Sequence, residues 1–134
     1  MRALIACVVV ALATASQDTT WVKTASGLTY AVLRAGTGAV AARGQSVTIH
    51  ETTTLMNGTV VYDSRAKNTP VTFLLGGNQV ITGVDEGVTG MRVGERRMLV
   101  IPPKLSVRSM YPANTPKDST LRIDLELISV REPR

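Results

Sequence analysis

The sequence has 134 residues, of which 44% are hydrophobic, so it is long enough for one domain with its own core and short for two. Its formal net charge is +5, from 15 Lys and Arg against 10 Asp and Glu. The basic residues are spread out and aromatic residues are few, which argues against a nucleic-acid partner. With Cys7 as the single cysteine and His50 as the single histidine, the sequence offers no zinc site and no internal disulfide, and we expect no metal or cofactor.

Residues 1–15 are predicted to be a secretory signal peptide. Arg2 precedes an apolar run that ends at Ala13, and Ala13 with Ala15 gives the A-x-A pattern of a cleavage site. The run is shorter than the roughly 20 residues of a membrane-spanning helix. A lipoprotein signal at Cys7 is the alternative, but there the apolar run would precede the cysteine. We therefore expect an exported protein, periplasmic or secreted, cleaved near Ala15 and not stably inserted in a membrane.

Residues 16–26 form a polar segment that leads into a domain expected to span residues 27–134. Strand-like runs follow in chain order, separated by turns that contain glycine. The clearest lies near the end, where Leu121, Ile123 and Leu125 alternate with charged residues, as in a strand with one wet face. The candidate runs are "LTYAVLR" (28–34), the two runs beside Asn57-Gly58, "PVTFLL" (70–75), "ERRMLVIPP" (95–103) and "STLRIDLELISV" (119–130).

Asn57-Gly58 predicts a β-hairpin with a type I′ turn, because both central residues of that turn need a positive φ. One short helix is predicted near residues 83–89, with Thr82 and Asp85 as a capping box and Gly90 as its stop. Together these elements indicate an α+β fold, in which a curved antiparallel β-sheet of five to six strands wraps around one short α-helix.

The strand that contains Val47 and Ile49 carries two titratable residues on opposite faces. Alternation places His50 opposite Val47 and Ile49, which favours a surface histidine over a catalytic one. The same alternation places Glu51 on the inner face with them, where a lone carboxylate is unfavourable. Glu51 then either lies at the mouth of the strand, reaching water or an arginine, or supplies a charge at the edge of a ligand groove.

Three segments in order, "NGTVVYDSR", "PVTFLLGGNQVITGVDEGVTGMRVGERRMLVIPPKL" and "STLRIDLELISV", resemble the FK506-binding-protein (FKBP-type) family of peptidyl-prolyl cis-trans isomerases. The resemblance extends from about Gly27 to Val130 and is strongest from Asn57 to Pro103. It implies the same curved sheet on a short helix. It also implies an apolar pocket that accelerates rotation about Xaa-Pro bonds by favouring a twisted amide over the planar one.

The resemblance also implies which residues form that pocket. Tyr62 and Asp63 match the family's aromatic and its pocket aspartate, and both are assigned catalytic roles. Phe73, Val80 and Ile81 match residues that line the pocket. Asp63 has a second reading, as a residue that caps the turn after its strand.

Five further pocket positions depart from the family, where aromatic residues are usual. These are Glu51, Val71, Val84 (in place of the floor tryptophan), Val107 and Ile123. The loop from Lys104 to Ser119 also differs in arrangement, which leaves the equivalence of Val107 open by one position and makes Tyr111 a second candidate.

Two functions of different classes follow from this pattern. The first is an exported prolyl isomerase of weakened activity that assists protein folding. The second is a catalytically degenerate module that binds unfolded or proline-containing polypeptides without isomerising them. A purely structural role is the fallback. In the first two cases the expected partners are proline-containing polypeptide clients, and a monomer is expected because the sequence has no long amino-terminal helical region for dimerisation.

Overall fold

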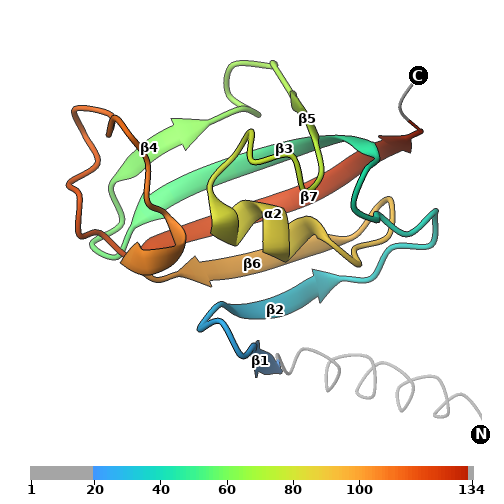
Figure 1. Cartoon of the computed structure of the whole chain (residues 1–134), viewed down its shortest axis with the longest axis horizontal. Coiled ribbons are helices and arrows are strands. Elements are labelled where there is room, and N and C mark those ends of the chain that lie inside the picture. Colours follow the sequence, from blue (N-terminus) through green and yellow to red (C-terminus); the bar gives the residue numbers. More distant parts are fainter. Residues whose placement is uncertain (1–19, 133–134) are drawn as a thin grey trace, which may run out of the picture.

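The computed structural model describes residues 20–132, and the predicted signal peptide lies outside this range. Within it the chain forms seven strands, one α-helix and one turn of 3-10 helix (Figure 1). Their bounds are β1 Trp21–Lys23, β2 Thr29–Arg34, β3 Ser46–Leu55, β4 Val60–Asp63, β5 Val71–Leu74, α2 Thr82–Val88, β6 Arg96–Ile101, η1 Pro103–Leu105 and β7 Leu121–Arg131.

All seven strands belong to one antiparallel sheet of order β1-β2-β6-β7-β3-β4, with β5 paired to β3 beside β4. The α+β class with one short helix is confirmed. The prediction of five to six strands missed β1, which forms within the segment expected to be a polar lead. Trp21 and Val22 are β-prone residues, and they pair with Ala31 and Tyr30 of β2.

The alternation predicted for β7 is present and builds the centre of the core. Its Leu and Ile side chains, from Leu121 to Leu127, are buried on the face of the sheet that carries the helix, whereas Arg122, Asp124 and Glu126 point to the other face. We call the face covered by α2 the inner face of the sheet (Figure 1). β7 lies between β6 and β3, so this apolar row runs down the middle of the inner face.

Helix α2 packs on β6 closely because two of its residues lack side chains. A Cβ atom on Gly83 would lie 2.6 Å from Ile101 Cγ2, and one on Gly87 would lie 2.5 Å from Leu99 Cδ1. Both distances are shorter than Cβ contacts in proteins, so a side chain at either position would force Ile101 or Leu99 to shift. Val84 and Val88 are buried on the same helix, as their four-residue spacing predicts.

The predicted capping box is wrong. The helix begins at Thr82 with Ile81 as its N-cap, and no side chain caps it. Asp85 Oδ1 instead accepts a hydrogen bond from the backbone N–H of Gly76 at 2.7 Å, which ties the helix to the loop after β5. Gly90, the predicted stop, has a φ of 90° just after the C-cap residue Thr89.

The hairpin at Asn57-Gly58 joins β3 and β4 as predicted, but its turn is not of type I′. Gly58 has a φ of 94°, whereas Asn57 is not among the described residues of positive φ. The Gly58 N–H donates to the Leu55 carbonyl, and the Leu55 N–H donates to the Thr59 carbonyl, both at 2.9 Å. This is a three-residue loop that ends in a left-handed glycine.

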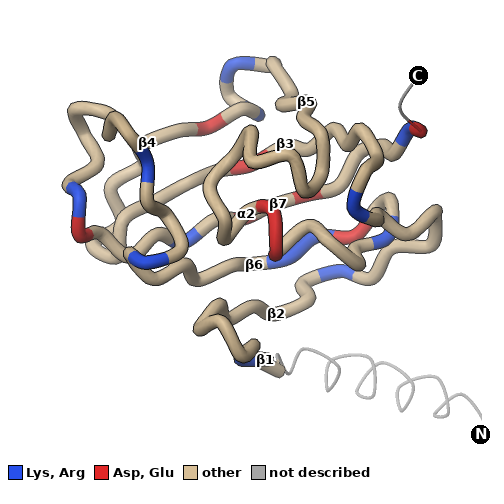
Figure 2. Tube along the Cα trace, in the orientation of Figure 1, with Lys and Arg blue, Asp and Glu red and all other residues tan. Residues whose placement is uncertain are grey.

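The outer face of the sheet carries charge. Arg96 forms two hydrogen bonds to the Asp124 carboxylate, at 2.7 and 2.8 Å, and Arg34 pairs with Glu126 at 3.0 Å. Figure 2 shows the other basic residues dispersed over several loops and strands. Across residues 20–132, no helix has the length and apolarity needed to cross a membrane.

Candidate functional site: an apolar pocket with two opposed charges

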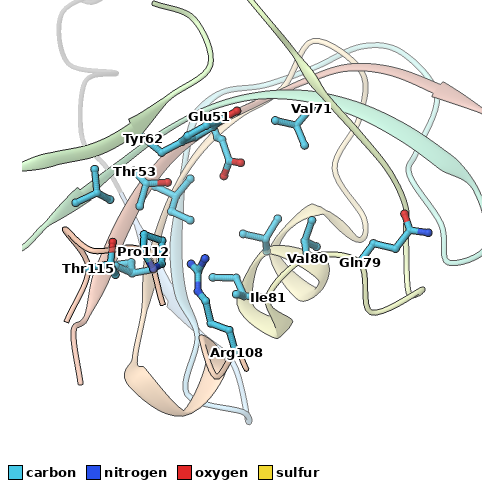
Figure 3. A pocket seen from close by; sticks show the side chains of 14 residues that line it. Glu51, Thr53, Tyr62, Val71, Gln79, Val80, Ile81, Arg108, Pro112 and Thr115 are labelled. Carbon is cyan, nitrogen blue, oxygen red and sulfur yellow. The ribbon is translucent and has the colours of Figure 1, made fainter. Parts of the chain in front are cut away.

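A pocket of about 400 Å³ lies at the end of the inner face that α2 leaves uncovered. Its walls come from β3, β4, β5, the start of α2, β7 and the loop between η1 and β7 (Figure 3). The lining residues are Glu51, Thr53, Val61, Tyr62, Val71, Gln79, Val80, Ile81, Val84, Arg108, Pro112, Thr115, Leu121 and Ile123.

The floor of the pocket is aliphatic. Val84 of α2 and Ile123 of β7 are 3% and 1% exposed, and each belongs to both the core and the pocket lining. Val80 and Ile81 stand at the start of the helix beside them. The sequence placed all four residues in the pocket, and they meet there because the helix N-terminus lies over the middle of the sheet.

Tyr62 supplies the aromatic residue in the described pocket wall. The ammonium group of Lys67 lies 4.7 Å from the centre of its ring, a cation–π contact that holds the ring between β4 and the following loop. The backbone N–H of Ile81 has no acceptor within residues 20–132. It is therefore free to donate a hydrogen bond to a ligand.

Glu51 points into the pocket from β3, as the alternation from Val47 and Ile49 predicted. Its backbone is held on the far side by Ser64, whose Oγ accepts from the Glu51 N–H at 2.8 Å. Burial raises the pKa of the Glu51 carboxyl, and the positive charge of Arg108 offsets part of that rise. His50 faces away from the pocket lining and hydrogen-bonds Ser64 Oγ at 2.9 Å.

Arg108 enters the pocket from the loop after η1, and no pattern in the sequence predicts this position. The Tyr111 hydroxyl accepts a hydrogen bond from its backbone N–H at 3.3 Å, and the Asn114 side chain donates to the Val61 carbonyl at 3.3 Å. The first contact lies within the loop, and the second holds the loop against β4. The family resemblance placed a pocket residue at Val107 or one position away from it. The residue that lines the pocket is the next one, Arg108.

Val107, Tyr111 and Phe73 do not line the pocket, although the sequence assigned them to it. Val107 is 69% exposed, because the buried pair Leu105 and Ser106 anchors the chain just before it and turns it outward. Tyr111 accepts a hydrogen bond from the Arg108 backbone instead. Phe73 lies in the core, where it pairs with Val47 at the covered end of the inner face.

Asp63 also lies outside the pocket lining. Its Oδ1 accepts hydrogen bonds from the backbone N–H groups of Arg65 and Ala66, at 3.1 and 3.2 Å, and from the Thr52 hydroxyl at 3.1 Å. These bonds, led by the one from Ala66, lower the pKa of the Asp63 carboxyl. The geometry matches the turn-capping interpretation of this residue.

The missed lining residues divide into two kinds. Thr53 and Leu121 continue the alternation of Glu51 and Ile123, so the strand pattern carried a signal for them. The others are Val61, which alternation places on the face opposite Tyr62, and the loop residues Gln79, Arg108, Pro112 and Thr115, for which the sequence carried no signal.

Comparison with known proteins shows which sequences this chain resembles. The sequence model of the FKBP-type peptidyl-prolyl cis-trans isomerase family matches residues 38–128. FK506-binding protein 1 of Dictyostelium discoideum is 38% identical over 106 residues, 78% of this chain and 99% of that protein. Peptidyl-prolyl cis-trans isomerase Fkbp12 of Drosophila melanogaster is 43% identical over 88 residues, 65% of this chain and 82% of that protein.

Solved structures agree. FkpA from Escherichia coli superposes with a TM-score of 0.77 at 29% identity, over 95% of this chain and 59% of that one. AtFKBP13 superposes with a TM-score of 0.74 at 30% identity, over 82% of this chain and 98% of that one. By sequence and by structure, the chain belongs to the FKBP-type peptidyl-prolyl cis-trans isomerase family.

Proposed function

We propose that this protein is an exported prolyl isomerase of weakened activity that assists the folding of proline-containing polypeptides. The observation that carries the proposal is the pocket itself, which combines an aliphatic floor with hydrogen-bond donors at its wall. Export rests on the signal-like sequence of residues 1–15.

An aliphatic pocket of this kind is suited to the reaction. Rotation about an Xaa-Pro bond crosses a barrier of about 18–20 kcal/mol, and the bond loses its resonance as it twists. The planar amide is the more polar form, so a site without water favours the twisted one. No nucleophile is needed, and the proline ring would rest on Val84, Ile123 and Leu121.

Two donors would hold the client backbone while it twists. The free N–H of Ile81 is one, and the Arg108 guanidinium is the other. Arg108 would take the place of the aromatic residue that the family resemblance implies one position earlier. A guanidinium donor forms a charge-assisted hydrogen bond, which is stronger than a neutral one.

The activity is expected to be weak because the floor is small. Val84 offers an isopropyl group where the family resemblance implies an indole, so a client proline contacts less apolar surface. A loss of about 3 kcal/mol in preference for the twisted state corresponds to roughly a hundredfold in rate.

A non-catalytic binding module is the second candidate, and Glu51 is the observation that favours it. An ionised carboxylate beside the floor disfavours the dry environment that catalysis needs, while it leaves hydrogen bonding to a client intact. Such a module would bind proline peptides and leave their exchange rate unchanged.

NMR exchange spectroscopy on a proline peptide with the purified protein separates the two. We expect wild type to accelerate cis-trans exchange, Val84→Trp to raise that rate by up to a hundredfold, and Arg108→Ala to lower it by about tenfold. Val107→Ala is the matched control, because this exposed neighbour of Arg108 lies outside the pocket. Binding with acceleration only in Val84→Trp would establish the binding module, and no binding by any variant would contradict both functions.

A further inference from the structure

The pocket contains two opposite charges that do not pair with each other. Figure 3 shows Glu51 and Arg108 entering it from opposite walls, one from β3 and one from the loop before β7. No carboxylate within residues 20–132 lies within 4.0 Å of the Arg108 guanidinium. These are the two charged residues among the fourteen that line the pocket.

Neither charge has a hydrogen-bond partner from the described part of the chain. Arg108 Nε is buried and unbonded. The hydrogen bonds of Glu51 involve its backbone, and none reaches its carboxylate. Two other buried charges have charged neighbours: Glu95 bonds both the Arg97 side chain and the Arg92 N–H, and Arg65 Nη2, which also has no hydrogen bond, lies 3.6 Å from the Asp124 carboxylate. The pocket is therefore built with one acceptor and one cationic donor left for something else.

The chemistry of that partner follows by elimination. A cationic group would pair with Glu51 but would be repelled by Arg108, and an anionic group would pair with Arg108 but would be repelled by Glu51. An apolar group would leave both charges without a hydrogen-bond partner, which is also unfavourable. A neutral group with an acceptor on one side and a donor on the other satisfies both, and a primary carboxamide has this arrangement.

We propose that Glu51 and Arg108 make the pocket selective for prolines preceded by Asn or Gln. The carboxamide oxygen would accept from one N–H group of Arg108, whose guanidinium has further N–H groups for the client backbone. The carboxamide NH₂ group would donate to Glu51, while the proline ring occupies the aliphatic floor. This selectivity rests on the proposed function in one respect, that the pocket takes proline peptides. It does not depend on whether the protein accelerates their exchange.

Four capped peptides that differ in the residue before proline test the proposal. The residue is Gln, Glu, Lys or Leu, and dissociation constants are measured by NMR titration of the purified protein at pH 8. We expect the Gln peptide to bind about tenfold more tightly than the Glu and Lys peptides, and several-fold more tightly than the Leu peptide.

Two charge-neutralising variants give the sharper readout. In Glu51→Gln the repulsion of an acidic residue is removed while Arg108 remains, so the Glu peptide should gain about tenfold in affinity relative to the Lys peptide. In Arg108→Gln the Lys peptide should gain by a similar factor. Val107→Ala should leave the ranking of all four peptides unchanged.

The proposal is overturned if wild type prefers the Leu peptide, if it binds none of the four, or if the two variants leave the ranking as in wild type. The outcome is separate from that of the proposed function. Selective binding without faster exchange would contradict the isomerase and support the selectivity. Equal binding of all four peptides with equal acceleration of their exchange would support the isomerase and contradict the selectivity.

Discussion

The two ends of the inner face differ in how tightly they are packed. Under α2, Gly83 and Gly87 bring the helix so close to β6 that there is no room for a methyl group. At the other end the same sheet borders a pocket of about 400 Å³, with two unpaired charges in its wall. Both ends share β7, whose Leu125 and Leu127 lie in the packed half while Leu121 and Ile123 line the pocket. The packed end supplies the stability that allows the other end to stay open.

Substitution at the packed end should have the largest effect on stability. Leu99 is fully buried beneath Gly87, so Leu99→Ala should lower the free energy of unfolding by about 2–5 kcal/mol. Val61→Ala, at the half-buried edge of the pocket, should cost less than about 1.5 kcal/mol. Urea unfolding followed by circular dichroism measures both. Equal losses would show that the two ends do not differ in packing.

Gly87→Ala tests the close approach directly. The added Cβ would overlap Leu99 Cδ1 and cost about 1–3 kcal/mol, against a gain of roughly 1 kcal/mol in helix propensity. We therefore expect a net loss near 1 kcal/mol. In the Leu99→Ala background the overlap is gone, so the same change should be neutral or stabilising. An identical loss in both backgrounds would mean that the helix, rather than the contact, determines the effect.

The smallest expected effects on stability come from the carboxylates of Glu51 and Asp63. Their contributions to stability change with pH in opposite directions. Burial raises the pKa of Glu51, so the folded state holds its proton more tightly and the stability it contributes is lost as pH rises through that raised pKa. Hydrogen bonds lower the pKa of Asp63, so its contribution is present at neutral pH and is lost as pH falls through the lowered pKa.

Urea midpoints measured from pH 3 to pH 8 test these signs. Glu51→Gln should be more stable than wild type at pH 8, and this advantage should shrink toward pH 4. Asp63→Asn should be less stable than wild type at pH 7, with the difference fading at the acid end. A destabilised Glu51→Gln at pH 8 would show that its carboxylate has a partner in the folded state.

The sequence was most informative where the chain is periodic. The alternation of β7, the apolar pair Val84 and Val88, and the position of Glu51 all follow from spacing, because a strand or a helix fixes which side chains share a face. The capping box failed for a physical reason: Asp85 bonds the distant backbone of Gly76, and no local pattern encodes a tertiary contact.

The pocket was predictable on its strand and helix walls and not on its loop wall. Val71, Val80, Ile81 and Ile123 lie where the resemblance implied. Arg108 replaces Val107 because buried Leu105 and Ser106 anchor the loop, and the register of such a loop depends on packing that spacing does not reveal. The role of Asp63 was equally hard to predict, because a carboxylate that follows a strand can either cap a turn or contact a ligand.

The order of strands in the sheet also constrains how the protein folds. β1 and β2 form one group, β3, β4 and β5 form another, and β6 and β7 join them. The two groups therefore cannot become one sheet before β7, which ends at Arg131, is available. During synthesis the first 120 residues would expose the unpaired edge of β3, and the final step would pair segments some 70 residues apart, as in Thr53 with Ile123. A protein proposed to assist the folding of others thus has, in its own chain, a late step that leaves a sheet edge open.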